Sequence, residues 1–281
     1  MPASSVRADR GPVPQTLLAI ALLAAAGALA AFGPLLSGLD PLTQNVARAN
    51  ADPSVAHWLG NDHLGRDIFT RLAVGTRLTM VVALASTAGA ILLGAVLGLV
   101  CVAAGRTFEF LAFGAFDLVR AMPSILLAMT LLVALGPGVP PVTLAIAIAF
   151  APVFAHVARA AWARETTSGY VAAAATMGSP PLVTLARHVA PNVAGAVVTQ
   201  AAIVMPRAIT TESVLSFFGI GVTPGTPTWG RMIADSVKHA EAAPTAVLAP
   251  VLALALTTLA FALLGDRLRL RWDPLRKGSN A

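Results

Sequence analysis

The chain has 281 residues, of which 57% are hydrophobic and 11% charged, and its mean hydropathy is +0.77. Soluble domains carry about 25% charged residues, so a core of ordinary size cannot bury the apolar groups of this chain, and lipid must be its solvent. The formal charge of +6 would suggest a nucleic-acid partner in a soluble protein, but here nearly all basic residues are arginines that flank apolar runs, which is typical of membrane topology and excludes nucleic acid as an expected partner.

Long apolar runs predict six transmembrane helices, because about 20 apolar residues are enough to cross a bilayer. The runs cover residues 13–36, 78–105, 110–135, 142–158, 193–217 and 244–265. The first run is longer than the hydrophobic stretch of a signal peptide, so we expect a retained anchor rather than a cleaved signal. The expected fold class is an all-α integral membrane protein.

The longest hydrophilic segment, residues 38–77, follows the first run. It contains four side chains that could ligate a divalent metal: His57, Asp62, His63 and Asp67. Asn61-Asp62 and Gly65 also suit turns and helix caps, and this second interpretation is the stronger one. We therefore expect no metal site.

Two of the expected spans contain charged residues, which are costly in lipid and are functional candidates by default. Asp117 and Arg120 lie in the third run, three residues apart, so they can pair on one helix face. Arg207 and Glu212 lie in the fifth. All four are candidates for the lining of a pathway or for structural ion pairs.

The second run contains Gly94 and Gly98, a G-x-x-x-G spacing that lets helices approach closely. In a chain with 23 glycines, chance explains this spacing equally well. The chain's one cysteine, Cys101, lies in the same run and excludes an internal disulfide and any multi-cysteine metal site.

The distribution of basic residues predicts the orientation, because cytoplasmic segments carry an excess of lysine and arginine. With the termini inside, the inner segments hold eleven basic residues: Arg7, Arg10, Arg106, Arg159, Arg164, Arg187, Arg267, Arg269, Arg271, Arg276 and Lys277. The outer segments hold six: Arg48, Arg66, Arg71, Arg77, Arg231 and Lys238. Both termini are therefore expected in the cytoplasm.

A polar, glycine- and proline-punctuated stretch, Ser168 to Asn192, separates the fourth and fifth runs and is expected on the cytoplasmic side. Its alanines predict a short helix from Tyr170 to Met177 that Gly178 ends. Ser179 can cap a second helix, with Pro180 and Pro181 in its first turn. Two helices that are joined by a glycine and lie outside the lipid are typical of a site that binds another protein.

The order of residues in this stretch resembles the cytoplasmic EAA loop of ABC importer permeases. The matching residues are Tyr170, Val171, Ala172, Ala173, Ala174 and Gly178, followed by Arg187-His188-Val189-Ala190-Pro191-Asn192. His57 to Asp67, Leu215 to Gly221 and Pro227 to Gly230 also resemble segments of one group, the dipeptide, oligopeptide and nickel importers. Together they point to the C-type permease of that group.

The resemblance implies a type I importer fold with three parts. Residues 1–77 would form a cytoplasmic N-terminus, a first anchor and an external segment. Residues 78–265 would form a permease core of five transmembrane helices with a coupling loop at 164–192, and residues 266–281 a basic cytoplasmic tail. The loop residues implied to meet the ATPase are Tyr170, Val171, Ala172, Ala173, Ala174, Met177, Gly178, His188 and Pro191. The family commonly has glutamate where this chain has Ala172, so the contacts of that acid do not carry over.

The implied function is that of a non-enzymatic, multi-pass subunit of the inner membrane. It would pair with a homologous B-type permease, bind two cytoplasmic ABC ATPases and receive substrate from an external binding protein. ATP and Mg²⁺ would be bound by the ATPases, since this chain has no G-x-x-x-x-G-K-[ST] phosphate loop. Di- or oligopeptides are the leading cargo, with nickel, glutathione or another small solute as alternatives.

Two other classes of function remain as alternatives. A proton-coupled secondary transporter could use Asp117 or Glu212 as a relay, but such proteins carry inverted repeats, which this sequence does not show. An intramembrane hydrolase would need a nucleophilic serine in a Gly-x-Ser-x-Gly turn. No such turn accompanies His156 in the sequence.

Overall fold

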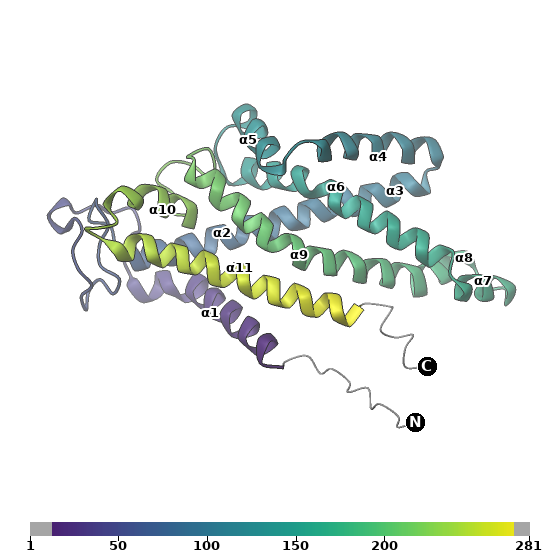
Figure 1. Cartoon of the computed structure of the whole chain (residues 1–281), viewed down its shortest axis with the longest axis horizontal. Helices are drawn as coiled ribbons and strands as arrows, with labels where there is room; N and C mark the ends of the chain where they lie inside the picture. Colours follow the sequence, from purple (N-terminus) through teal and green to yellow (C-terminus); the bar gives the residue numbers. More distant parts are fainter. Residues whose placement is uncertain (1–12, 273–281) are drawn as a thin grey trace, which may run out of the picture.

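The computed structural model describes residues 13–272, and within that range the chain is helical, with no β-strand beyond an isolated bridge between Asn61 and Asp67. The long helices run side by side in three layers (Figure 1). Five of them are long and apolar enough to cross a membrane, and a sixth crossing is possible if one sharply bent pair counts as a span. The predicted all-α membrane class is confirmed.

Three long helices form the central layer: α2 (Ile68–Ala90), α6 (Val139–Thr166) and α9 (Ala190–Phe217). The helices α1 (Val13–Ser37) and α11 (Pro244–Trp272) pack along one side of this layer. The helices α4 (Arg106–Ala121) and α5 (Ser124–Leu135) cover the other side (Figure 1). The helix α1 packs against both α2 and α11.

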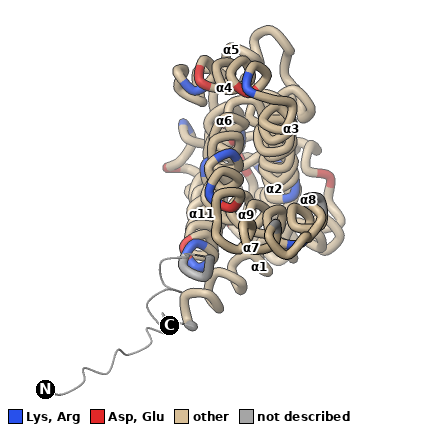
Figure 2. Tube along the Cα trace, turned by 90° about the vertical axis from the view of Figure 1, so that its right-hand side faces the viewer, with Lys and Arg blue, Asp and Glu red and all other residues tan. Residues whose placement is uncertain are grey.

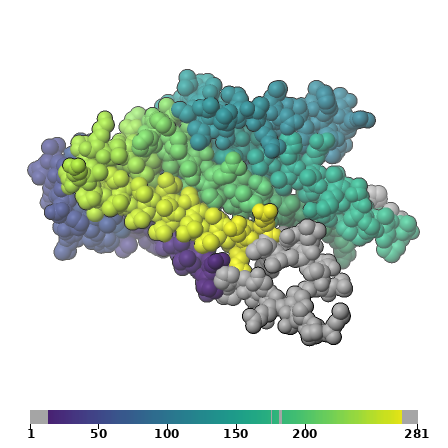
Figure 3. Space-filling model, in the orientation of Figure 1, coloured from purple at the N-terminus to yellow at the C-terminus, as the bar shows by residue number. Residues whose placement is uncertain are grey.

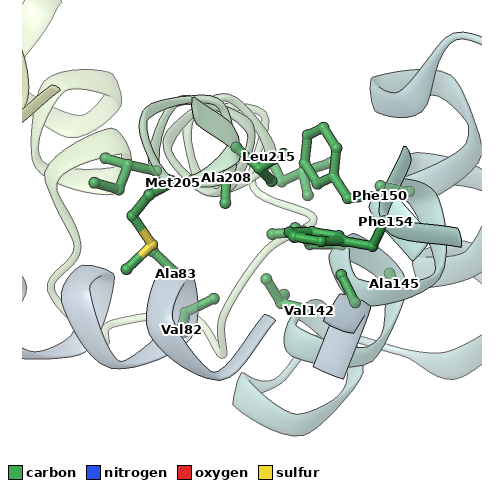
Figure 4. Packing of buried hydrophobic residues seen from close by; sticks show 14 of the residues in the cluster. Val82, Ala83, Val142, Ala145, Phe150, Phe154, Met205, Ala208 and Leu215 are labelled. Atoms are coloured by element: carbon green, nitrogen blue, oxygen red, sulfur yellow. The ribbon is translucent and has the colours of Figure 1, made fainter. Parts of the chain in front are cut away.

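The core lies where α2, α6 and α9 meet (Figure 4). Phe150 and Phe154 of α6 are buried against small residues such as Ala83 of α2 and Ala208 of α9. Between membrane helices lipid offers no hydrophobic driving force, so close van der Waals packing supplies the stability. The many alanines of these helices therefore allow their backbones to approach closely.

The helix α2 continues through a π-helical segment (Ile91–Val96) into α3 (Leu97–Ala103), and this segment packs on α6. A Cβ added to Gly94 would lie 2.0 Å from the carbonyl oxygen of Ala151, and one added to Gly98 would lie 3.3 Å from the Cβ of Ala155. The G-x-x-x-G pattern is thus a true site of close helix approach.

The third predicted span, 110–135, does not form one straight helix. It consists of α4 and α5, which are bent by 97° relative to each other. Pro123 explains the break, because a proline disfavours helical backbone in the residue before it, and Met122 is extended with φ −91° and ψ 140°. Hydropathy alone does not register this interruption.

Other helices extend beyond the predicted runs. The helix α2 begins at Ile68, where Asp67 caps it by accepting a hydrogen bond from the amide of Thr70. The helix α6 continues to Thr166, and α11 continues to Trp272 into the predicted basic tail. The rest of that tail, residues 273–281, lies outside the described residues.

Short helices occupy the two ends of the bundle. One end carries the segment 38–67 with a 3₁₀ turn (Val46–Arg48), together with α10 (Trp229–Ser236) and the 3₁₀ turn that follows it (Val237–His239). The opposite end carries α7 (Gly169–Thr176) and α8 (Pro181–Thr184), with the start of α1 and the end of α11 (Figure 1). The described termini and the 168–192 stretch therefore share one side, as predicted.

Candidate functional site

The segment 164–192 folds as one short helix, a glycine turn and a second helix. Gly178 has φ +75°, a left-handed conformation that favours glycine. The amide of Ser179 donates to the carbonyl of Ala174 at 3.0 Å, which satisfies a carbonyl at the end of α7. The predicted helix and its stop at Gly178 are confirmed.

The second helix differs from the prediction of a separate helix outside the lipid. The helix α8 passes directly into a π-helical segment (Leu185–Val189) and then into α9 without a break. The hydroxyl of Ser179 accepts a hydrogen bond from Thr184 at 3.1 Å, inside the first turns of this helix. A displacement at the glycine turn would therefore act directly on a membrane helix.

One face of α7 is exposed and almost uncharged. Ala172, Ala173 and Thr176 are exposed, and the side chain of Met177 at the tip is 80% exposed. Figure 3 shows this end of the chain projecting beyond the bundle, and Figure 2 looks onto it. An exposed apolar surface at the tip of a projecting element is typical of a protein-binding site.

The inner side of α7 is held by polar contacts around one carboxylate. Tyr170 donates its hydroxyl to Oε2 of Glu165 at 2.8 Å, and the amide of Asn192 donates to the same oxygen at 2.8 Å. The ring of Tyr170 also packs edge-on against His188, with 5.9 Å between ring centroids. Two predicted site residues, Tyr170 and His188, are thus brought together.

The remaining predicted loop residues are spread along the segment. Val171 packs partly against the core, Ala174 is half-buried, and Pro191 is exposed in the first turn of α9. Glu165 lies inside the predicted loop range, but its role was not predicted from the sequence. The available signal was an acidic residue in the last turn of a helix, where acids are disfavoured.

The intramembrane charges are not paired as predicted. Asp117 lies against α6, with Oδ1 2.9 Å from Nε2 of His156, but without the alignment of a hydrogen bond. Asp117 therefore links α4 to α6 and does not pair with Arg120, whose side chain is exposed. A second link joins the same helices, since Arg159 Nε donates to Glu109 at 2.6 Å.

The two charges of α9 face different surroundings. Arg207 is exposed and stacks over the ring of Phe150 at 5.4 Å. Glu212 is fully buried and accepts a hydrogen bond from Ser216 at 2.7 Å, with the hydroxyls of Thr79, Ser213 and Thr228 close by. The position of Glu212 supports the structural alternative over a place in the pathway.

The segment with the possible metal ligands is built of turns and caps. Asp62 accepts hydrogen bonds from the amides of Leu64 and Arg66, at 2.9 and 3.0 Å, and Asp67 caps α2. Asp67 also lies 2.8 Å from His57 Nδ1. Within residues 13–272 no three histidine, cysteine or acidic side chains form a metal-binding group.

A partly buried set of ionic contacts joins this segment and the start of α2 to α10, and we call it the outer charge cluster after the orientation predicted from the sequence. Its members are Asp62, Arg66, Arg71, Arg231 and Asp235. Arg66 Nε donates to Asp62 at 2.7 Å, and Asp235 lies 3.4 Å from Arg66 and 3.5 Å from Arg71. Because each positive side chain lies next to a negative one, Asp62, Arg66 and Arg71 can remain buried.

The rings of His63 and His239 stack next to this cluster with centroids 4.6 Å apart. Burial is the main cause that lowers the pKa of His63, and the charge of Arg66 acts in the same direction. The carboxylate of Asp62 opposes this shift without reversing it. Its surroundings at the outer charge cluster therefore favour the neutral form of His63.

Comparison with known proteins gives a consistent result. The sequence profile of the family described as "Binding-protein-dependent transport system inner membrane component" matches residues 90–277. The dipeptide transport system permease protein DppC of Alkalihalophilus pseudofirmus is 34% identical over 249 residues, 89% of this chain and 82% of that protein. A probable peptide ABC transporter permease protein of Sinorhizobium fredii is 38% identical, covering 94% of this chain and 90% of its own length.

A third relative is named for a different cargo. The glutathione transport system permease protein GsiD of Pectobacterium atrosepticum is 36% identical over 230 residues, which are 82% of this chain and 76% of that protein.

Proposed function

Because this chain belongs to the family of inner membrane components of binding-protein-dependent transport systems, we propose that it forms half of a peptide pathway driven by cytoplasmic ATPases. The chain is a multi-pass membrane transport subunit. The cargo, the individual partners and the orientation are the parts that we propose.

The observation that carries the proposal is the construction of the α7 end. The helix α7 projects beyond the bundle and exposes Ala172, Ala173 and Met177 to a partner. Its two neighbours in the chain, α6 and the continuous α8–α9 helix, both run into the core. A partner that pushes on α7 therefore acts on two membrane helices at once.

We place this end in the cytoplasm, together with both termini, because basic residues gather in the segments on that side. The ATPases would then bind α7, and they would hold the ATP and Mg²⁺. A binding protein would deliver cargo at the opposite end, where the outer charge cluster braces the segment 38–67.

A second permease of the B type would complete the pathway. We place its contact surface at the pair α4 and α5, which exposes large apolar side chains such as Phe110, Leu118 and Val133. Lipid can cover the same groups, so this surface fits either a partner helix or the bilayer. The two helices of this pair are bent by 97° at Pro123.

Peptides are the cargo best supported, because two of the relatives described above are named for peptides or dipeptides. The test is uptake of labelled di- and tripeptides, glutathione and nickel by cells with and without this gene. Loss of di- or oligopeptide uptake alone supports the proposal. Loss of only nickel or glutathione uptake would assign that alternative cargo instead.

A further inference from the structure

Glu165 lies in the last turn of α6, and its carboxylate is almost enclosed. The residue is 9% exposed, and its two oxygens accept hydrogen bonds from three side chains. Oε2 accepts from Tyr170 and Asn192, each at 2.8 Å, and Oε1 accepts from Arg164 Nε and Nη2 at 3.2 and 3.1 Å. The carboxylate therefore contacts α7 and α9 while belonging to α6.

Helix stability does not explain an acid at this place. The C-terminal end of a helix is the negative end of its dipole, where a carboxylate is disfavoured. The neighbouring Arg164 offsets this only in part, because the side chain of Arg164 is 57% exposed and its charge is screened by water. What a glutamate gains at position 165 is its hydrogen bonds from Tyr170 and Asn192.

The helix α7 has little else to fix its orientation. None of its described side chains is fully buried, and among those described only Val171 packs partly against the hydrophobic core. The remaining links are the Tyr170 hydroxyl, the Tyr170 ring on His188, and the Ser168 hydroxyl, which donates to the carbonyl of Glu165 at 2.6 Å. Two of these three links end on Glu165.

Oε2 is shared by donors from two different helices. If Tyr170 moves and Oε2 moves with it, the oxygen that accepts from Asn192 moves as well. A rotation of α7 therefore strains the hydrogen bond to the start of α9. The same movement pulls on the end of α6. A hydrogen bond to a charged group is roughly twice as strong as a neutral one, which makes this junction stiffer than the rest of α7.

We propose that Glu165 is a positioning residue that ties α7 to both α6 and α9, so that displacement of α7 by a partner moves the two membrane helices together. This role rests on the proposed binding of ATPases at α7. It adds to that binding a specific connection through which the movement of α7 reaches the membrane.

Three variants and a control separate this role from simple folding. Glu165→Ala removes both side-chain oxygens and keeps the backbone carbonyl that accepts from Ser168, whereas Glu165→Gln retains one side-chain oxygen that can still accept from Tyr170 and Asn192. Tyr170→Phe deletes one donor and leaves the ring on His188. Glu241→Ala changes an exposed glutamate at the opposite end of the helical bundle and serves as the control.

The complete importer, with both permeases, its ATPases and the binding protein, is reconstituted in vesicles, and peptide uptake and ATP hydrolysis are measured together. We expect Glu165→Ala to recover the ATPases normally but to lose about fivefold or more in peptide taken up per ATP hydrolysed, a typical size of coupling between sites. Tyr170→Phe should lose part of that ratio, and a double variant that combines Tyr170→Phe with Glu165→Ala should lose no more than Glu165→Ala. Glu165→Gln keeps an acceptor without its charge, so it should lose less than Glu165→Ala.

An unchanged ratio of uptake to hydrolysis in an assembled Glu165→Ala complex would overturn the proposal. If that variant does not assemble, Tyr170→Phe decides: a reduced ratio supports the role of Glu165, and a normal ratio contradicts it. Failure of the unaltered chain to recover ATPases would instead refute the proposed function, so the two failures are distinguishable.

Discussion

Gly94 lies so close to Ala151 that a Cβ at Gly94 would stand 2.0 Å from the carbonyl oxygen of Ala151. This approach occurs in the π-helical segment that joins α2 to α3, where it packs on α6. Because the neighbour is backbone, the contact cannot relax by rotating a side chain.

We expect Gly94→Ala to separate the two helices and to destabilise the protein by about 1–3 kcal/mol, the usual cost of overpacking. The measurement is the thermal unfolding midpoint of the purified chain in detergent. Gly114→Ala is the matched control, because nothing lies within 4 Å of a Cβ at Gly114. Equal unfolding midpoints for Gly94→Ala and Gly114→Ala would contradict the prediction, because they would show that the helices can separate at Gly94 without loss of stability.

Glu212 is predicted to be structural. Glu212→Ala should leave the hydroxyl of Ser216 without its acceptor in a buried site, at a cost of about 1–3 kcal/mol. Glu212→Gln keeps a carbonyl oxygen for Ser216 and should lose much less. The checks are the unfolding midpoint and peptide uptake of the assembled importer.

Loss of uptake in a stable, assembled Glu212→Gln complex would contradict this assignment and would favour the proton-relay alternative. The exposed Glu241→Ala serves again as the control for expression and unfolding.

The outer charge cluster should be sensitive to the loss of one partner. Asp62→Asn keeps an oxygen for the amides of Leu64 and Arg66 but leaves the buried guanidinium groups of Arg66 and Arg71 short of negative charge. Breaking a buried pair costs about 3–5 kcal/mol. Limited proteolysis of the segment 38–67 should therefore be faster in this variant.

Asp52→Asn, an exposed change in the same segment, should leave the proteolysis rate unchanged. The same rate in both variants would mean that the charges do not hold the segment to α10.

Ala172→Glu should be tolerated. Ala172 is exposed on α7, so a glutamate there extends into solvent or toward a partner and does not disturb the core. The expected result is normal recovery of the ATPases with the chain. Loss of assembly would show that the alanine itself is required at the interface.

Five of the apolar runs were sufficient to predict a membrane helix each, because length and a low content of charge are enough to favour lipid. The runs could not predict the bend at Pro123, since a hydropathy average over the run does not register where a proline interrupts the helix. Hydropathy also placed the start of the second helix too late, because the first turns of α2 are polar and are stabilised by the Asp67 cap and the outer charge cluster.

The candidate site was predictable in outline only. The alanine run and Gly178 were sufficient to predict α7 and its end, because both are local properties of the backbone. The junction at Glu165 depends on Asn192, 27 residues further along the chain, and no local pattern indicates that contact. The continuity of α8 with α9 likewise depends on how the helix enters the core at Val189.

The most direct test of the account is whether α7 holds the ATPases. Tagged wild-type chain, a variant lacking residues 170–177, and Gly178→Pro are expressed with the second permease and the ATPases and are then purified from detergent-solubilised membranes. We predict that both variants insert in the membrane and retain the second permease but lose the ATPases. Normal ATPase recovery and normal peptide uptake in either variant would contradict the central claim.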